Sequence, residues 1–309
     1  MMLELKIDPN VLNKLQEIAL SSTTNVDLSI YDWLSEEYIE TDQGIKIKVF
    51  KIRAQNPTNI TVVVIPGLSS HFYGWILIDY VLSHIANVYH IESREKKSAI
   101  YSRKKKVSYH LEDFAKDLSS VINRYNLDKD GFYCLGDSFG AEMIIKYLDL
   151  GFSSPRGLIL ISPVKRFSFS RWMRALFIIG PHWFYKPFLP IIRCVLKNFR
   201  TDMKNDAPTY YINKRNVETG DSKRMKKCAL ELTKYTSTAD YSKIKCPTYI
   251  IAASTDKMHD YNQSVEIAKA IPNCVFEDVV YFSKTHTCEV AEKIIAFIMK
   301  VEEQKIKGQ

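Results

Sequence analysis

Three polar residues of the types used in acyl transfer occur in the order Ser138, Asp256, His286 along the 309-residue chain. Ser138 is the centre of a Gly-x-Ser-x-Gly motif, residues 136–140, that follows an apolar, β-prone run at 132–135 and precedes a helix-like pattern. This order predicts a strand, a sharp turn and a helix. The two glycines remove Cβ atoms that would clash with the next strand and helix. We therefore predict that Ser138 is a nucleophile.

The other two residues supply the chemistry that a serine needs. A serine hydroxyl is a weak nucleophile until a base takes its proton. His286 is predicted to take this proton through Nε2 and return it to the leaving group, and Asp256 to hold the other ring nitrogen. Asp260 is a competing acid, but Asp256 is closer to its predicted strand. Six further histidines lie outside the loop before the final helix: His71, His84, His90, His110, His182 and His259.

The elements that must position these residues follow from hydrophobic patterning. Continuous apolar runs at 60–65, 132–135, 157–163 and 247–253 are typical of buried strands in a parallel sheet. Further strands are predicted at 37–41, 45–52, 88–91 and 275–282, and helices at 9–19, 73–85, 111–122, 141–148, 264–271 and 290–301. Strands that alternate with helices predict a mostly parallel central sheet flanked by helices. Ligands bind at the carboxyl ends of such strands, where the three polar residues occur.

With these elements in this order, the chain resembles the α/β-hydrolase fold family over about residues 37–301. The resemblance implies a helical cap inserted after strand six, and it places the oxyanion donors at the backbone N–H groups of Leu68 and Phe139. Within the family, the chain looks most like the monoacylglycerol lipase and lysophospholipase branch, on account of its apolar cap and the loop at Arg94. The family's Arg-Gly-x-Gly-x-Ser loop occurs here without glycines, as Arg-Glu-Lys-Lys-Ser at 94–98.

The expected organisation has three parts. Residues 1–36 form an accessory segment, 37–163 and 241–309 form the α/β core, and 164–240 form the cap. Within the cap, residues 166–200 mix aromatic and aliphatic side chains with Arg and Lys. This mixture suits either an ordinary cap or a lid that rests on an anionic membrane surface. The cap aromatics predicted to contact substrate are Trp172, Phe177, Trp183 and Phe184.

Composition narrows the class of partner. The formal net charge of +8 suits nucleic acid, a membrane surface or an acidic ligand. The basic run at 103–106 is not interleaved with aromatic residues, so no nucleic-acid partner is predicted. The six cysteines are widely spaced and predict reduced thiols rather than a metal site, as in a cytoplasmic protein. Neither a signal peptide nor an apolar run of about 18 residues is recognised.

These observations predict a serine hydrolase that cleaves a carboxylic ester through an acyl-Ser138 intermediate. The apolar cap favours a single-chain acyl lipid such as a monoacylglycerol or a lysophospholipid, and the basic residues favour a nearby phosphate or carboxylate. No metal or organic cofactor is implied, because the triad supplies nucleophile, base and orienting group. Two alternatives stay open: an acyl thioesterase or acyltransferase, and a non-catalytic ligand-binding protein on the same scaffold.

Overall fold

A computed structural model describes residues 8–21, 26–102, 104–168, 178, 180 and 185–307. Its strands form one eight-stranded sheet in the order β1-β2-β4-β3-β5-β6-β7-β8. The pairs β1/β2 and β2/β4 are antiparallel, and every later pair is parallel. The strands are β1 (Leu34–Glu40), β2 (Lys46–Ile52), β3 (Thr61–Ile65), β4 (Asn87–Glu92), β5 (Tyr133–Asp137), β6 (Gly157–Ile161), β7 (Thr248–Ala252) and β8 (Cys274–Asp278). The predicted, mostly parallel sheet is confirmed.

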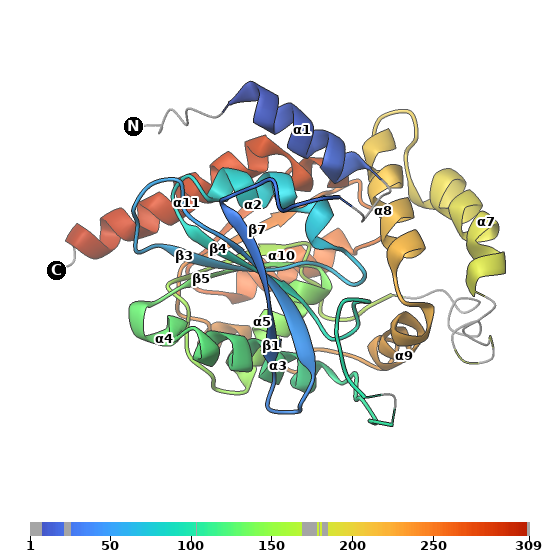
Figure 1. Cartoon of the computed structure of the whole chain (residues 1–309), viewed down its shortest axis with the longest axis horizontal. Helices are drawn as coiled ribbons and strands as arrows, with labels where there is room; N and C mark the ends of the chain where they lie inside the picture. Colours follow the sequence, from blue (N-terminus) through green and yellow to red (C-terminus); the bar gives the residue numbers. More distant parts are fainter. Residues whose placement is uncertain are drawn as a thin grey trace.

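Helices cover both faces of the sheet (Figure 1). One face carries α1 (Pro9–Leu20), α2 (Ile76–Leu82) and α11 (Cys288–Lys307), and the other carries α3 (Leu111–Arg124), α4 (Leu127–Asp130) and α5 (Phe139–Asp149). The helix α10 (Tyr261–Ala270) packs its Ile267 into the same apolar cluster as α3 and α5. The predicted helix at the start of the chain is α1, which is capped by Asp8 and begins with a proline.

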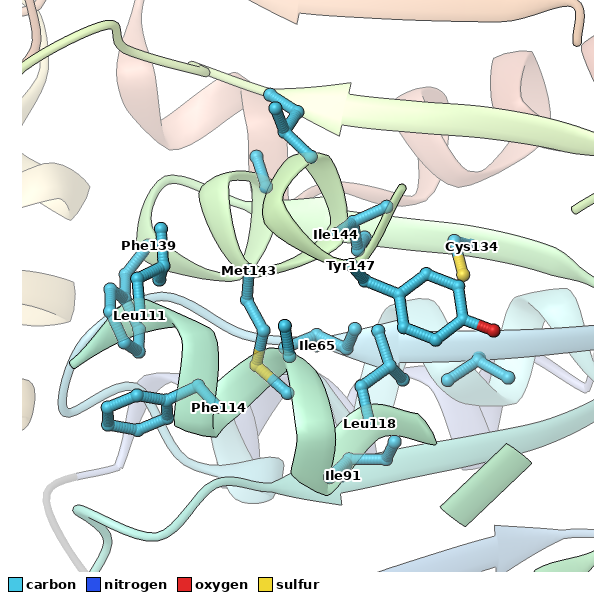
Figure 2. Close-up of a cluster of buried hydrophobic side chains, with 14 of the residues drawn as sticks. Ile65, Ile91, Leu111, Phe114, Leu118, Cys134, Phe139, Met143, Ile144 and Tyr147 are labelled. Carbon is cyan, nitrogen blue, oxygen red and sulfur yellow. The ribbon is translucent and has the colours of Figure 1, made fainter. Parts of the chain in front are cut away.

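The cluster between the sheet and helices α3 and α5 holds the segment after Ser138 in place. Figure 2 shows Phe139 and Met143 of α5 lying against Leu111 and Phe114 of α3. The rings of Phe114 and Phe139 meet edge to face, with centroids 4.8 Å apart. Because burial of one such side chain stabilises the fold by about 1.5 to 3 kcal/mol, this contact fixes the start of α5 firmly.

In the part of the β6–β7 segment that the structure describes, three α-helices gather at one end of the sheet (Figure 1). They are α7 (Tyr185–Val195), which continues into a π-helical turn at Leu196–Arg200, α8 (Ala207–Thr219) and α9 (Ser222–Leu232). They belong to the segment 164–240 that the sequence predicts as a cap. Pro190 lies inside α7, where it removes one backbone hydrogen bond from the helix.

The last predicted strand is too long. β8 ends at Asp278 rather than at residue 282, so the prediction is wrong over 279–282. The carboxylate of Asp278 accepts hydrogen bonds from the backbone N–H groups of Val280 at 2.8 Å and Ser254 at 2.9 Å, and Val280 has a φ of 64°. An aspartate that binds the backbone two residues ahead forms a tight turn, which ends the strand.

A buried carboxyl group ties α5 to the cap segment. Glu142 is fully buried and accepts hydrogen bonds from the Val164 backbone N–H at 3.1 Å and the Tyr235 hydroxyl at 2.9 Å. Burial raises the pKa of Glu142 from its ordinary value of 4.5 to about 8, although both hydrogen bonds lower it. The folded protein therefore holds this proton more tightly than the unfolded chain does.

This pKa shift makes stability depend on pH. Since the folded pKa of Glu142 lies above the unfolded value, its contribution is present at low pH and is lost as pH rises from 4.5 to about 8. Glu142→Gln should therefore flatten the decline of the unfolding free energy between about pH 5 and about pH 9, measured by urea denaturation. Glu17→Gln, on the exposed side of α1, is the control and should leave the slope as it is. A slope unchanged by Glu142→Gln would contradict the prediction.

Candidate active site

Ser138 is the single residue between β5 and α5, and its backbone is strained. Its φ of 50° and ψ of −108° lie where residues other than glycine pay about 1 to 3 kcal/mol. A Cβ on Gly136 would lie 2.7 Å from the Ala141 nitrogen, and one on Gly140 would overlap the Ile65 carbonyl oxygen. The glycines thus let α5 and β3 approach the turn closely, as the motif predicts. Ser138 lies at the carboxyl edge of the sheet and lines a cavity there.

A histidine and an aspartate complete a hydrogen-bonded chain with this serine. His259 Nε2 lies 2.8 Å from Ser138 Oγ, and His259 Nδ1 lies 2.6 Å from Asp256 Oδ2. The other oxygen of Asp256 accepts the Met258 backbone N–H at 2.6 Å. An Nδ1–H donated to the carboxylate leaves the Nε2 lone pair facing the serine hydroxyl. This is the geometry of an activated serine nucleophile.

The prediction that His286 contacts Ser138 is wrong, because His259 holds that place. Nδ1 of His286 lies 2.7 Å from Thr285 Oγ1, and its ring packs edge-on against Trp75 with centroids 4.7 Å apart. Burial and the nearby charges of Arg215 and His259 lower the pKa of His286 to about 3. A ring with this pKa is a poor proton acceptor at neutral pH.

The sequence holds a local signal for His259 that strand position alone does not reveal. Asp256 and His259 are three residues apart in the turn between β7 and α10, and the Asp256 side chain binds the backbone inside this turn. A tight turn brings side chains at this spacing together. Asp260, the competing acid, instead caps α10 through the Asn262 backbone N–H at 3.1 Å.

The charges around His259 prepare it to accept a proton. Burial by itself lowers the pKa of His259, but the charge and hydrogen bond of Asp256, with the charge of Asp137, outweigh burial and raise it. Burial likewise opposes ionisation of Asp256, yet His259 holds the pKa of Asp256 below its ordinary value. Burial raises the pKa of Asp137 to about 6. The protonated form of His259 is therefore stabilised by the charges of Asp256 and Asp137.

Two backbone N–H groups are available for an oxyanion. Phe139 is the first residue of α5, and the first N–H groups of a helix lack partners inside the helix. Leu68 follows β3 and lines the same cavity as Ser138. Neither N–H has an acceptor within the described part of the chain. The predicted placement of donors at Leu68 and Phe139 stays a prediction that this arrangement supports.

The cavity at Ser138 has a volume of about 350 Å³ and a mostly apolar wall. The cap segment contributes most of the apolar side chains: Phe167, Tyr185, Phe188, Ile192, Val195, Leu196, Val217 and Met225. Three cationic residues, Arg166, Arg200 and Lys226, also line it. Volumes of 300 to 1,000 Å³ with few polar groups are typical of small-molecule sites.

The four aromatic residues predicted to contact substrate, Trp172, Phe177, Trp183 and Phe184, lie outside the described residues. Among the side chains that the structure places, no group of three or more His, Cys, Asp or Glu could hold a metal ion. All six cysteines are free. Over the same ranges, every helix is too short or too polar to cross a membrane.

A mostly parallel sheet covered on both faces, with a serine, a histidine and an aspartate at its carboxyl edge, defines an α/β-hydrolase fold. The family model for serine aminopeptidase S33 matches residues 97–290, and the chain belongs to this family. No curated protein matches the chain.

Solved structures share this fold at low sequence identity. An esterase from Thermogutta terrifontis has 16% identity and a TM-score of 0.67, with 86% of this chain and 99% of that chain covered. An esterase from Exiguobacterium antarcticum has 16% identity and a TM-score of 0.68, with 85% and 98% covered. A bacterial membrane phospholipase A has 15% identity and a TM-score of 0.65, with 95% and 92% covered. These likenesses show the fold.

Mutation can show whether His259 or His286 is the catalytic base. His259→Ala should lower kcat on a p-nitrophenyl ester by at least about 10³-fold, as expected for removal of a triad base. His286→Ala should keep kcat within about tenfold of the parent, because the ring of His286 hydrogen-bonds to Thr285, whereas Ser138 and Asp256 hydrogen-bond to His259. Folded protein would be compared by circular dichroism, because fluorophosphonate labelling itself depends on the base. A larger loss of kcat in His286→Ala than in His259→Ala would show that His286 is the base.

The pH dependence of kcat/KM tests whether Asp256 is the carboxylate that pairs with His259. A base must be neutral to accept a proton, so kcat/KM should rise with pH through the raised pKa of His259. Asp256→Asn removes the charge that raises this pKa, so the acid limb should move to lower pH while kcat falls by about 10⁴-fold. Asp260→Asn, the same change one residue past His259, should leave the limb in place. Equal movement in both variants would contradict the assignment of Asp256.

Proposed function

We propose that this protein is a serine hydrolase that cleaves carboxylic esters through an acyl-Ser138 intermediate. The observation that carries the proposal is the hydrogen-bonded chain Asp256–His259–Ser138 at the wall of an apolar cavity. Such a chain turns a neutral hydroxyl into a nucleophile without a metal. The fold alone would not support the proposal, since this scaffold hosts many activities.

The proposed reaction has two halves. His259 Nε2 takes the proton of Ser138 Oγ as the oxygen attacks the ester carbonyl, and the carbonyl oxygen becomes an oxyanion that Leu68 and Phe139 N–H stabilise. His259 then gives this proton to the leaving alkoxide, which departs as an alcohol. In the second half a water molecule loses a proton to His259 and attacks the acyl-serine. Collapse of the new tetrahedral intermediate releases the carboxylic acid, and Ser138 recovers its proton.

A single acyl chain is the substrate part that the cavity suits. Its wall is built from cap side chains such as Phe188, Ile192 and Val217, which offer contacts to an alkyl chain but few to a polar group. Neighbours with this fold are named as esterases and as a phospholipase A. These names favour an ester over an amide. A thioester would pass through the same acyl-serine, so thioesterase or acyltransferase activity stays the alternative.

The charges at the cavity favour an anionic group on the substrate. Arg166, Arg200 and Lys226 line it, and in the described part of the chain none of them pairs with a carboxylate. Arg200 and Lys226 donate instead to backbone carbonyls, of Lys257 at 2.7 Å and Gly180 at 2.6 Å. We therefore favour a lysophospholipid over a neutral monoacylglycerol as the substrate, because these cations would attract its phosphate.

Contact with a membrane through the cap stays part of the proposal. Ile191 of α7 and Phe199 of the π-helical turn that follows it expose 55% and 70% of their surface. Exposed apolar side chains beside basic residues favour an anionic lipid surface.

Activity on esters is tested first. Wild-type protein should hydrolyse p-nitrophenyl esters with kcat/KM rising from acetyl toward longer acyl chains, because each added methylene buries more apolar surface, about 0.8 kcal/mol at most. Ser138→Ala should lose hydrolysis and fluorophosphonate labelling together. Acyl-CoA substrates in the same panel distinguish a thioesterase. Esters that are hydrolysed equally by Ser138→Ala would refute the proposal.

The anionic group is tested with a matched pair of substrates, lauroyl glycerol and lauroyl glycerol phosphate. Wild-type protein should favour the phosphate, and Lys226→Gln should reduce that preference about three- to tenfold by removing one charge contact. Lys227→Gln is the control, because this neighbouring lysine is exposed and does not line the cavity. If Lys226→Gln keeps the wild-type preference for the phosphate substrate, Lys226 does not bind the head group.

A further inference from the structure

The oxyanion turn after β3 is contacted by a buried lysine from a different loop. Lys96 is 1% exposed, and its Nζ donates a hydrogen bond to the Gly67 carbonyl oxygen at 2.6 Å. Its charge is balanced by Glu95, 2.7 Å away and also buried. A lysine is rarely buried to this extent unless it is paired. The N–H groups of the Lys96 ammonium therefore face protein groups rather than solvent.

The carbonyl that Lys96 contacts and the predicted oxyanion donor belong to one peptide group. The peptide between Gly67 and Leu68 contains the Gly67 C=O and the Leu68 N–H, and it is planar and trans. In a trans peptide the two groups point in opposite directions. Lys96 therefore holds one side of the peptide, and the N–H on the other side belongs to Leu68, which lines the cavity with Ser138.

We propose that Lys96 positions and polarises the Gly67–Leu68 peptide, so that the Leu68 N–H stabilises the oxyanion of the reaction proposed above. A cation on an amide oxygen draws electron density from the nitrogen and makes the N–H a stronger donor, since linked hydrogen bonds strengthen one another. Lys96 contacts neither substrate nor reacting atoms and is therefore a positioning residue. This inference rests on the proposed serine hydrolase function.

The turn and the lysine loop are both fixed by further contacts. The Gly67 carbonyl also accepts the Ser70 backbone N–H at 3.0 Å, and the Ser70 hydroxyl accepts the Trp75 indole N–H at 3.1 Å. On the other side, Arg224 of α9 donates to the carbonyl oxygens of Lys96 and Ala99. Preorganised donors of this kind act without reorganisation cost during the reaction.

A third contact comes from the strand that carries the nucleophile. The carboxylate of Asp137, directly before Ser138, packs against Gly67, since a Cβ on Gly67 would lie 2.8 Å from it. The Asp137 carboxylate and the Lys96 ammonium thus confine Gly67 from two sides. The residue can move little, so the direction of the following N–H is set before substrate binds.

The test compares variants that fold without a lone buried charge. Lys96→Met alone would leave Glu95 as a lone buried charge, and Glu95→Gln alone would leave Lys96 as one, so the decisive pair is wild-type protein against Glu95→Gln/Lys96→Met. Lys97→Met, at the exposed neighbouring lysine, is the matched control and should keep kcat. For each protein, kcat per fluorophosphonate-labelled site and KM are measured on a p-nitrophenyl ester. Affinity is also measured for a trifluoromethyl ketone, which Ser138 converts to a hemiketal oxyanion.

Loss of Lys96 should lower kcat about 10- to 100-fold, less than the roughly 10² to 10³ expected for removal of a whole oxyanion donor. Ketone affinity should fall by a similar factor while KM changes by less than about threefold, because the donor acts on the transition state. A purely structural role would lower the labelled fraction and leave kcat per site unchanged. Equal kcat per site in the decisive pair would overturn the inference.

Failure of the proposed function gives a different result. If wild-type protein hydrolyses no ester, the proposed activity is wrong, and calorimetric affinity for the trifluoromethyl ketone still separates the decisive pair. Weaker ketone binding without Lys96 would support the positioning role even then. Equal binding would overturn it.

Discussion

The close approach of α5 to the end of β3 is the constraint on which the site depends. Gly140 lies so near the Ile65 carbonyl that no side chain fits between them, and this contact sets the distance from the Ser138 turn to the turn at Gly67 and Leu68. The positive φ of Ser138 is the cost of ending a strand and starting a helix with one residue between them. The aromatic contact between Phe114 and Phe139 offsets that cost, because it fixes the first turn of α5 on the core (Figure 2).

Charged groups around this turn are buried in pairs, which gives the site its rigidity. Arg94, fully buried, binds Asp117 through two nitrogens at 2.7 Å, and Lys96 binds Glu95 and the Gly67 carbonyl. Glu92 accepts hydrogen bonds from the Phe72 backbone and the Ser98 hydroxyl. Burial alone would raise the pKa of Glu92, but His71, the Ser98 hydroxyl and the charge of His90 outweigh burial and lower this pKa to about 2. Breaking one such pair would leave a lone buried charge, at a typical cost of about 3 to 5 kcal/mol. The loop at 94–98 thus keeps a defined shape without the glycines of the family pattern, because ion pairs and hydrogen bonds fix its backbone.

The fold could be predicted from the sequence, but the histidine that contacts Ser138 could not. Strand order, the serine turn and the helices follow from hydrophobic periodicity and from glycine chemistry, which are local properties. The choice between His259 and His286 is not local. It depends on which of two loops presents its ring to Ser138, and the tight turn at Asp278 and Val280 carries the 279–286 segment toward Trp75. The overlong strand prediction and the wrong histidine have one cause, since both assumed that the chain continues straight to residue 282.

The pairing of acid and base on one turn has a mechanical consequence. In the arrangement predicted from the sequence, the two side chains would come from the loops after β7 and β8, so any shift between those loops would change the distance between them. In the structure Asp256 and His259 are separated by two residues, and the Asp256 carboxylate also binds the Met258 backbone N–H inside the turn. The hydrogen bond from Nδ1 to the carboxylate is therefore preserved when the turn moves as a unit. Movement of this turn would instead change the distance between His259 Nε2 and Ser138 Oγ. The ring of Phe282 stacks on His259, with centroids 5.7 Å apart, and limits this movement. The segment that carries His286 thus supports the base through Phe282, although it does not supply the base.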